Sequence, residues 1–103
     1  MYTIKSNGVR DEVVTTGAIK QTFDALSKKV RDTDFQVTIT ANKKDDFVID
    51  YECDIQSSIM KDKKNHTCVK APLLLTACKD ASDMYQRRWE VQKAKWEKQR
   101  YNM

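Results

Sequence analysis

Three carboxylates on one predicted strand have the spacing of a metal site. Asp50, Glu52 and Asp54 alternate with apolar residues, so they project from one face of the strand at intervals of about 7 Å. Carboxylates in such a row can hold Mg²⁺ or Ca²⁺, as in a metal-dependent nuclease. The row has no lysine at the close spacing that such nuclease sites use. We therefore interpret these three residues, the acidic face, as an exposed polar surface of a sheet.

The thiols and the single histidine suggest a second kind of site. Cys53, His66, Cys68 and Cys78 lack the paired C-x-x-C spacing that prearranges structural zinc. Cys53 falls on the apolar side of its strand, where a free cysteine behaves as a small hydrophobe. No orienting group or oxyanion loop accompanies His66 and Cys68, and two glycines provide no phosphate-binding loop. We expect no catalytic residues, no metal and no cofactor.

Residues 84–103, MYQRRWEVQKAKWEKQRYNM, gather the residue types that bind macromolecules. This segment contains both tryptophans, and its six basic and two acidic residues give it the +4 net charge of the whole chain. Tyr85, Trp89 and Trp96 share one face of a predicted helix, and Trp, Tyr and Arg often dominate binding energy in protein interfaces. The candidate partner-binding residues are Tyr85, Arg88, Trp89, Gln92, Lys95, Trp96 and Arg100.

Other interpretations of this helix stay open. Tyr85 and Trp89 can instead pack on the sheet of the protein itself, whereas the charged neighbours of Trp96 leave only a thin apolar stripe there. The same cations and rings can bind the phosphates and bases of a nucleic acid, although no known nucleic-acid-binding motif is present. The acidic face can also attract the basic helix, within the chain or from a second copy.

The first half of the chain predicts a hairpin followed by a helix. Residues 2–14 contain Asn7-Gly8, the preferred pair for a two-residue type I′ turn. Residues 17–30 predict an amphipathic helix that Thr15 or Thr16 caps. One apolar stripe along this helix is formed by Ile19, Phe23, Leu26 and Val30.

A second hairpin is predicted over residues 35–55, with a loop at 42–46. Apolar and polar residues alternate in both of its strands, which is typical of a sheet with one buried face. The predicted core side is formed by Phe35, Val37, Ile39 and Ala41 in the first strand and by Phe47, Ile49, Tyr51, Cys53 and Ile55 in the second.

The last part of the chain predicts a short strand at 68–71 and a helix over 72–101. Pro72 fits the first helical position, where its missing N–H costs nothing, or an edge strand that continues through Leu75. The helix can break near residue 79, because Asp80 can begin a separate helix. Thirty helical residues span about 45 Å, which exceeds the dimensions of a domain of about 100 residues. We therefore expect the helix to project from its domain.

Together these elements predict a single α+β domain over residues 1–103. Its expected parts are an antiparallel sheet of four to five strands, one packed amphipathic helix and a long basic C-terminal helix. No apolar run is long enough to cross a membrane, and no signal-peptide segment follows Met1. Three cysteines, an odd number without a close pair, fit reduced thiols, so we expect a cytoplasmic protein.

These features favour a small non-enzymatic interaction or regulatory protein. We expect it to bind a protein partner, or to form a homo-oligomer, through the C-terminal helix, and not to bind membranes. One alternative is a nucleic-acid-binding accessory protein that uses the same helix. Another is an inhibitor of a host factor, because this small chain rich in lysine and aspartate resembles such accessory proteins of phages.

Overall fold

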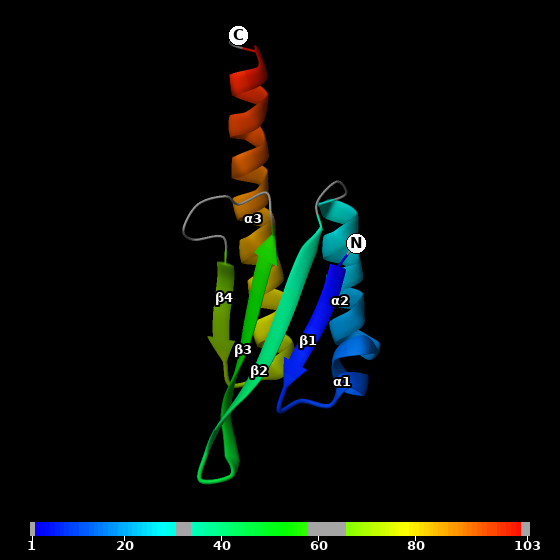
Figure 1. The fold of residues 1–103 in the computed structure, drawn as a ribbon, viewed down its shortest axis with the longest axis vertical. Coiled ribbons are helices and arrows are strands. Elements are labelled where there is room, and N and C mark those ends of the chain that lie inside the picture. The colour runs from blue at the N-terminus through cyan, green and yellow to red at the C-terminus, as the bar shows by residue number, and fades with distance from the viewer. Residues whose placement is uncertain (1, 31–33, 58–65, 102–103) are drawn as a thin grey trace.

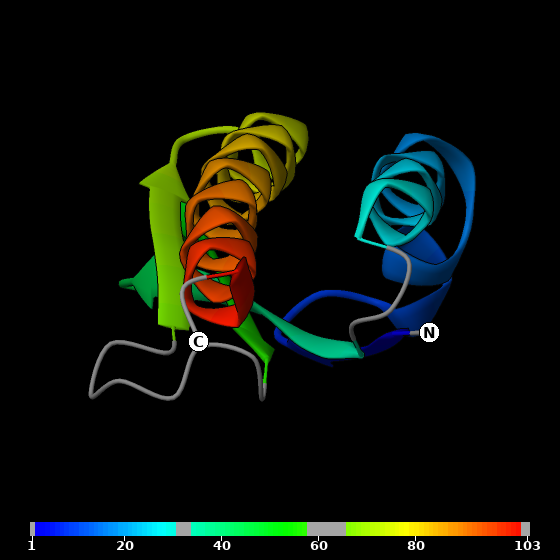
Figure 2. The ribbon, with the colours of Figure 1, turned by 90° about the horizontal axis from the view of Figure 1, so that it is seen from above.

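Three helices cover one face of a four-stranded sheet (Figures 1 and 2). The computed structural model describes residues 2–30, 34–57 and 66–101, and their side chains apart from those of 66 and 96–101. The elements are β1 (Tyr2–Asn7), α1 (Asp11–Thr15), α2 (Gly17–Lys29), β2 (Phe35–Lys44), β3 (Phe47–Ser57), β4 (His66–Ala71) and α3 (Leu74–Tyr101). The α+β class is confirmed, but the four-stranded sheet, in the order β1-β2-β3-β4, is mixed rather than antiparallel.

The hairpin predicted over residues 2–14 is wrong. The chain leaves β1 at Gly8, whose φ of 78° is in the left-handed region, and enters α1 instead of turning back. Asp11 and Glu12 occupy the first turn of α1, where the helix dipole favours negative charge, and Val14 is buried. The Ser6 hydroxyl lies 3.0 Å from Val9 O and 2.9 Å from Asp11 Oδ1, so these two acceptors share its single proton across the bend.

β1 pairs in parallel with β2, and α1 and α2 supply the crossover that a parallel pair requires. Tyr2 lies opposite Phe35 and Ile4 opposite Val37. The rings of Tyr2 and Phe35 are stacked, with centroids 5.2 Å apart and planes 5° apart. This contact adds aromatic packing to the backbone hydrogen bonds that hold β1 at the edge of the sheet.

The amphipathic helix predicted over residues 17–30 is confirmed as α2. Its four stripe residues, Ile19, Phe23, Leu26 and Val30, are all buried. Thr16 occupies the N-cap position, but its hydroxyl donates to Glu12 O in α1 and makes no capping bond. Gly17 has a φ of 64°, which lets α2 start in a new direction directly after α1.

The second hairpin is also confirmed, with longer strands and a shorter turn than predicted. Asp45 and Asp46 form the turn with positive φ at both positions. The register shifts between Asn42 and Lys43. Phe47 and Ile49 are 76% and 55% exposed, so their assignment to the core is wrong. The reason is geometric: this end of the hairpin extends past the helices that cover the rest of the sheet (Figure 1).

The core lies between the apolar face of the sheet and the three helices. It is formed by Val14, Ile19, Phe23, Leu26, Val30, Phe35, Val37, Ile39, Cys53, Ile55, Ala71, Ala77, Cys78, Ala81 and Tyr85. α3 is continuous past residue 79, so no second helix begins there. β4 ends at Ala71, the residue before Pro72, and α3 starts at Leu74, two residues after Pro72. Neither predicted position of Pro72, in the helix or in the strand, is therefore correct.

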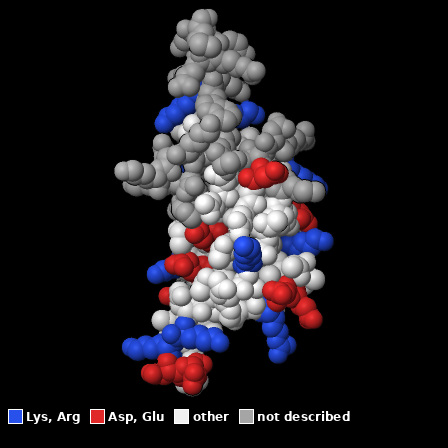
Figure 3. Space-filling model, viewed as in Figure 1, with Lys and Arg blue, Asp and Glu red and all other residues white. Residues whose placement is uncertain are grey.

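None of the three described helices lies on the opposite face of the sheet, as Figure 2 shows. We call this the open face, and it presents Gln36, Thr38 and Thr40 of β2 beside the carboxylates of β3. Charged groups are scattered there over a largely uncharged surface (Figure 3). No helix in the described ranges is both long and apolar enough to cross a membrane.

Candidate functional site

The inner face of α3 packs on β3 and β4. Ala77, Cys78 and Ala81 are small and fully buried, which lets the helix approach the sheet closely. Tyr85 is 0% exposed, and its ring lies 5.6 Å from that of Phe35 at an angle of 43°. Tyr85 is therefore a core residue, and its assignment to a partner-binding surface is corrected.

The hydroxyl of Tyr85 is an unusual feature of this core. Within the described residues, neither this hydroxyl nor that of Ser57 has a hydrogen-bond partner of normal geometry, although both are buried. Burial raises the pKa of Tyr85, and the nearby Ser57 hydroxyl opposes that effect. The ring thus stabilises the fold through apolar contact rather than through its polar group.

Arg88 and Trp89 fasten the middle of α3 to the domain. Arg88 Nη1 donates a hydrogen bond to Thr67 Oγ1 of β4 at 3.1 Å. Trp89 is half-buried and packs against the core, and Lys93 Nζ lies 5.0 Å from the centroid of its ring. At this distance the cation is attracted to the face of the indole. Both predicted contact residues therefore already make contacts within their own chain.

Of the other predicted contact residues, Gln92 is half-buried and Lys95 is exposed. The side chains of Trp96 and Arg100 lie outside the described part of the structure, although the helix backbone continues through both. Four of the seven predicted residues thus face the domain or lie at its boundary, and Lys95 alone of the five described side chains is fully exposed. The predicted set does not form one exposed surface.

The sequence reasoning missed Met84, Arg87 and Val91, which form the outer face of α3 together with the predicted Lys95. These residues follow one another at helical spacing and are all exposed, and Val91 keeps 57% of its accessible surface. The signal was present as two apolar residues, Met84 and Val91, which are seven positions apart and so share a helix face about a third of a turn away from Tyr85. The aromatic residues were the stronger candidates, because Trp and Tyr often dominate binding energy in interfaces.

The acidic face lies on the open face, so the sheet separates it from the described side chains of α3. Asn42 Nδ2 donates to Asp50 Oδ1 at 2.6 Å, and Lys70 Nζ lies 3.6 Å from Glu52 Oε1. In the described ranges, no three His, Cys, Asp or Glu side chains are arranged to hold a metal ion. The three carboxylates are thus neighbours of amide, hydroxyl and ammonium groups on a polar surface.

The cysteines occupy both faces of the sheet. Cys53 of β3 and Cys78 of α3 are fully buried, and a hydrogen bond between the two thiols, together with burial, raises the pKa of Cys53. Cys68 is on the open face, opposite Asp54. Partial burial and the Glu52 carboxylate raise the pKa of Cys68. Cys68 and Cys53 therefore project on opposite sides of the sheet, and the side chain of His66 lies outside the described part.

The protruding end of the β2–β3 hairpin exposes three consecutive apolar residues, Phe47, Val48 and Ile49. Lys43, Lys44, Asp45 and Asp46 surround them, and Figure 3 shows clustered positive and negative groups at that end. Phe47 is the most exposed large apolar side chain among the described residues. An exposed apolar surface with a polar rim is typical of a protein contact.

Comparison with models of known protein families and with curated protein sequences gave no match in either case.

Proposed function

We propose that this chain is a non-enzymatic interaction protein that binds a protein partner through the outer part of α3. The observation that carries the proposal is the length of this helix. Among the described side chains of α3, which reach Lys95, Trp89 is the last in the sequence that packs against the core, and twelve helical residues follow it. They extend the helix by about 18 Å, past the end of the sheet in Figure 1.

A helix segment of this length has little stability of its own in water, because helices shorter than about 12–15 residues are marginal when isolated. Tertiary packing of an apolar face normally supplies the missing stability. Beyond Trp89 the described part of α3 exposes Val91 instead of burying it. A partner that covers the outer face would bury Val91 and Met84 and would place Arg87 and Lys95 at the rim of the contact.

The experiment compares two exposed valines on helices. Immobilised full-length protein is used to capture partners from a native lysate. Val91→Glu, on α3, should abolish capture, because it removes the exposed apolar side chain and puts a charged group in the middle of the proposed interface. Val13→Glu, on α1, is the matched control, since Val13 is 44% exposed and Val91 57%. Equal capture by both variants and the unmodified chain would show that α3 does not bind the partner.

Deletion of residues 97–103 tests the end of the projecting helix, which lies beyond the outer face, without introducing a charge. The sheet and its core should stay folded, because all the core residues in the described part of the chain precede position 86. Loss of capture with an unchanged melting temperature supports the proposal. Sedimentation of the purified chain then distinguishes self-association, which needs no lysate component, from binding of a foreign protein.

The concentration of all the net charge in residues 84–103 favours nucleic acid as the second candidate partner. Lys93 and Lys95 are exposed on α3 and available to phosphates. If nucleic acid is the partner, nuclease treatment of the lysate removes the captured material. Each lysine substituted by glutamine would also reduce the slope of log affinity against log salt by about 0.7–0.9. A protein partner would instead survive nuclease and moderate salt.

A further inference from the structure

β1 leaves one edge of the sheet unpaired. Within the described residues it makes backbone hydrogen bonds with β2 alone. An edge strand presents N–H and C=O groups that can pair with another extended chain. The features that normally block such pairing are few here, since residues 2–7 contain no proline and only one charged side chain, Lys5.

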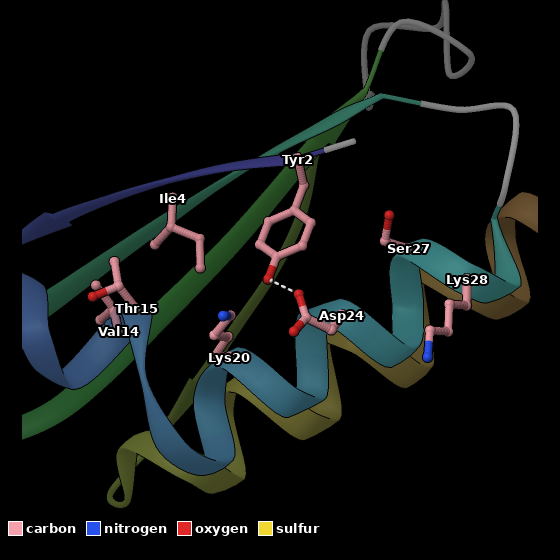
Figure 4. A pocket seen from close by; sticks show the side chains of 8 residues that line it. All are labelled: Tyr2, Ile4, Val14, Thr15, Lys20, Asp24, Ser27 and Lys28. Carbon is pink, nitrogen blue, oxygen red and sulfur yellow. Dashed lines mark hydrogen bonds between the residues drawn. The ribbon is translucent and has the colours of Figure 1, made fainter.

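A groove of about 600 Å³ runs between β1 and the helices beside it (Figure 4). At one end Ile4 of β1 and Val14 of α1 provide apolar side chains. At the other end Ser27 of α2 provides a hydroxyl, and Lys28 lies at the rim with its ammonium group directed away from Tyr2. Tyr2 crosses between the two ends, where its hydroxyl donates a hydrogen bond to Asp24 Oδ1. The groove thus has an apolar end and a polar end.

The wall of the groove formed by α2 is positively charged. Lys20, Asp24 and Lys28 follow one another at intervals of four residues, so they share one helix face. Asp24 accepts the hydrogen bond from Tyr2. Neither lysine has an ion-pair partner among the described residues. Lys20 directs its ammonium group toward β1 (Figure 4), where it is available to an incoming negative group.

We propose that β1 and α2 bind an extended segment of a partner protein, which adds to the sheet as a fifth strand. An added strand lies about 4.8 Å from β1, and every second side chain of it enters the groove. The side chain beside Ile4 contacts an apolar surface, and the one beside Tyr2 reaches the ammonium group of Lys20. The segment therefore carries an apolar residue and an acidic residue two positions apart. This surface is separate from α3 and does not depend on the function proposed for that helix.

A second copy of this chain is a poorer occupant of the same edge. Its own β1, with the sequence YTIKSN, has no carboxylate for Lys20. Pairing of two β1 strands would also bring Lys20 and Lys28 of one copy toward the same lysines of the other, because both α2 helices lie on the same side of the joined sheet. Like charges placed opposite one another oppose association. A foreign acidic segment supplies the carboxylate and does not bring a second set of these lysines.

The test is selection of a displayed library of random twelve-residue peptides on the full-length protein. We expect enrichment of peptides that contain an apolar and an acidic residue two positions apart. Methylation of alternate backbone nitrogens in a synthetic copy should abolish its binding, because strand addition depends on backbone hydrogen bonds. Lys20→Glu with Lys28→Glu should weaken binding of the selected peptide by about tenfold, whereas Lys79→Glu, an exposed control on α3, should not.

Amide chemical-shift changes in the ¹⁵N-labelled protein locate the bound peptide. Changes along β1 and α2, with β4 unaffected, support the assignment. The assignment is wrong if no peptide is enriched, if the selected peptides lack acidic residues, or if a methylated backbone binds equally well. Changes confined to α3 would also overturn it, while leaving the function proposed for that helix supported. Circular dichroism of the double variant verifies that its fold is retained.

Discussion

Substitution of Tyr85 distinguishes a core residue from an interface residue. Tyr85→Ala removes a ring that is 0% exposed and packs on Phe35. Truncation of a buried aromatic side chain to alanine costs about 3–5 kcal/mol. The total free energy of unfolding of a domain of this length is about 5–15 kcal/mol. Tyr85→Ala should therefore lose a large fraction of the stability of the protein.

Tyr85→Phe separates the ring from its hydroxyl. Within the described residues this buried hydroxyl has no partner of normal geometry. Its removal should therefore change the free energy of unfolding by less than about 1 kcal/mol. For Tyr85→Ala, by contrast, a loss of 3 kcal/mol or more in the free energy of unfolding corresponds to a decrease of at least about 12 °C in melting temperature, at about 4–8 °C per kcal/mol.

Thermal unfolding followed by circular dichroism gives these values, with Val91→Ala as the exposed control on the same helix. Val91→Ala should change the free energy of unfolding by no more than about 0.5 kcal/mol. If Tyr85→Ala melts like the unmodified protein but weakens association with a partner, Tyr85 is an interface residue. The packing of α3 described above would then be incorrect.

Four further expectations follow from the same structure. Phe23→Ala should cost about 3–5 kcal/mol, and an unchanged melting temperature would place Phe23 outside the core. Iodoacetamide should modify Cys68 alone in the folded protein and all three thiols after unfolding. A chelator should not change the melting temperature, and stoichiometric zinc in elemental analysis would contradict the assignment of three free thiols. Asp50→Asn with Glu52→Gln should leave the fold intact and alter the salt dependence of association, whereas nuclease activity lost in this variant would establish a metal site. Because burial raises the pKa of Tyr85 above the ordinary value near 10, stability should decrease as the pH rises above about 10, and less steeply in Tyr85→Phe.

The sequence predicted those elements whose pattern is local and repeated. The stripe of α2 repeats at helical spacing through Phe23, and the strands around Val37 and Cys53 alternate with a period of two. Both patterns report a single buried face, which is why the core was largely predictable. The pairing of β1 was not, because Asn7-Gly8 favours a local hairpin and its actual partner β2 begins almost thirty residues later.

The candidate site was predictable only in outline. Spacing placed Tyr85 and Trp89 on one face of a projecting helix, and the long helix is present. Periodicity alone does not determine which face meets the sheet when both faces carry large side chains. Likewise, the alternation through Phe47 continues past the point where the helices end. Phe47 lies beyond the helices because of the tertiary structure, which a local sequence pattern does not predict.

The parallel pairing of β1 also determines the order in which the sheet can assemble. β2 and β3 are joined by a two-residue turn, so their contacts close a very short loop, whereas β1 must close a loop of about thirty residues to reach β2. Loop-closure entropy favours the hairpin as the earlier structure. During synthesis β1 leaves the ribosome first, yet it can dock only after β2 has emerged. We expect its amides to exchange with solvent by an opening that leaves β2 and β3 paired.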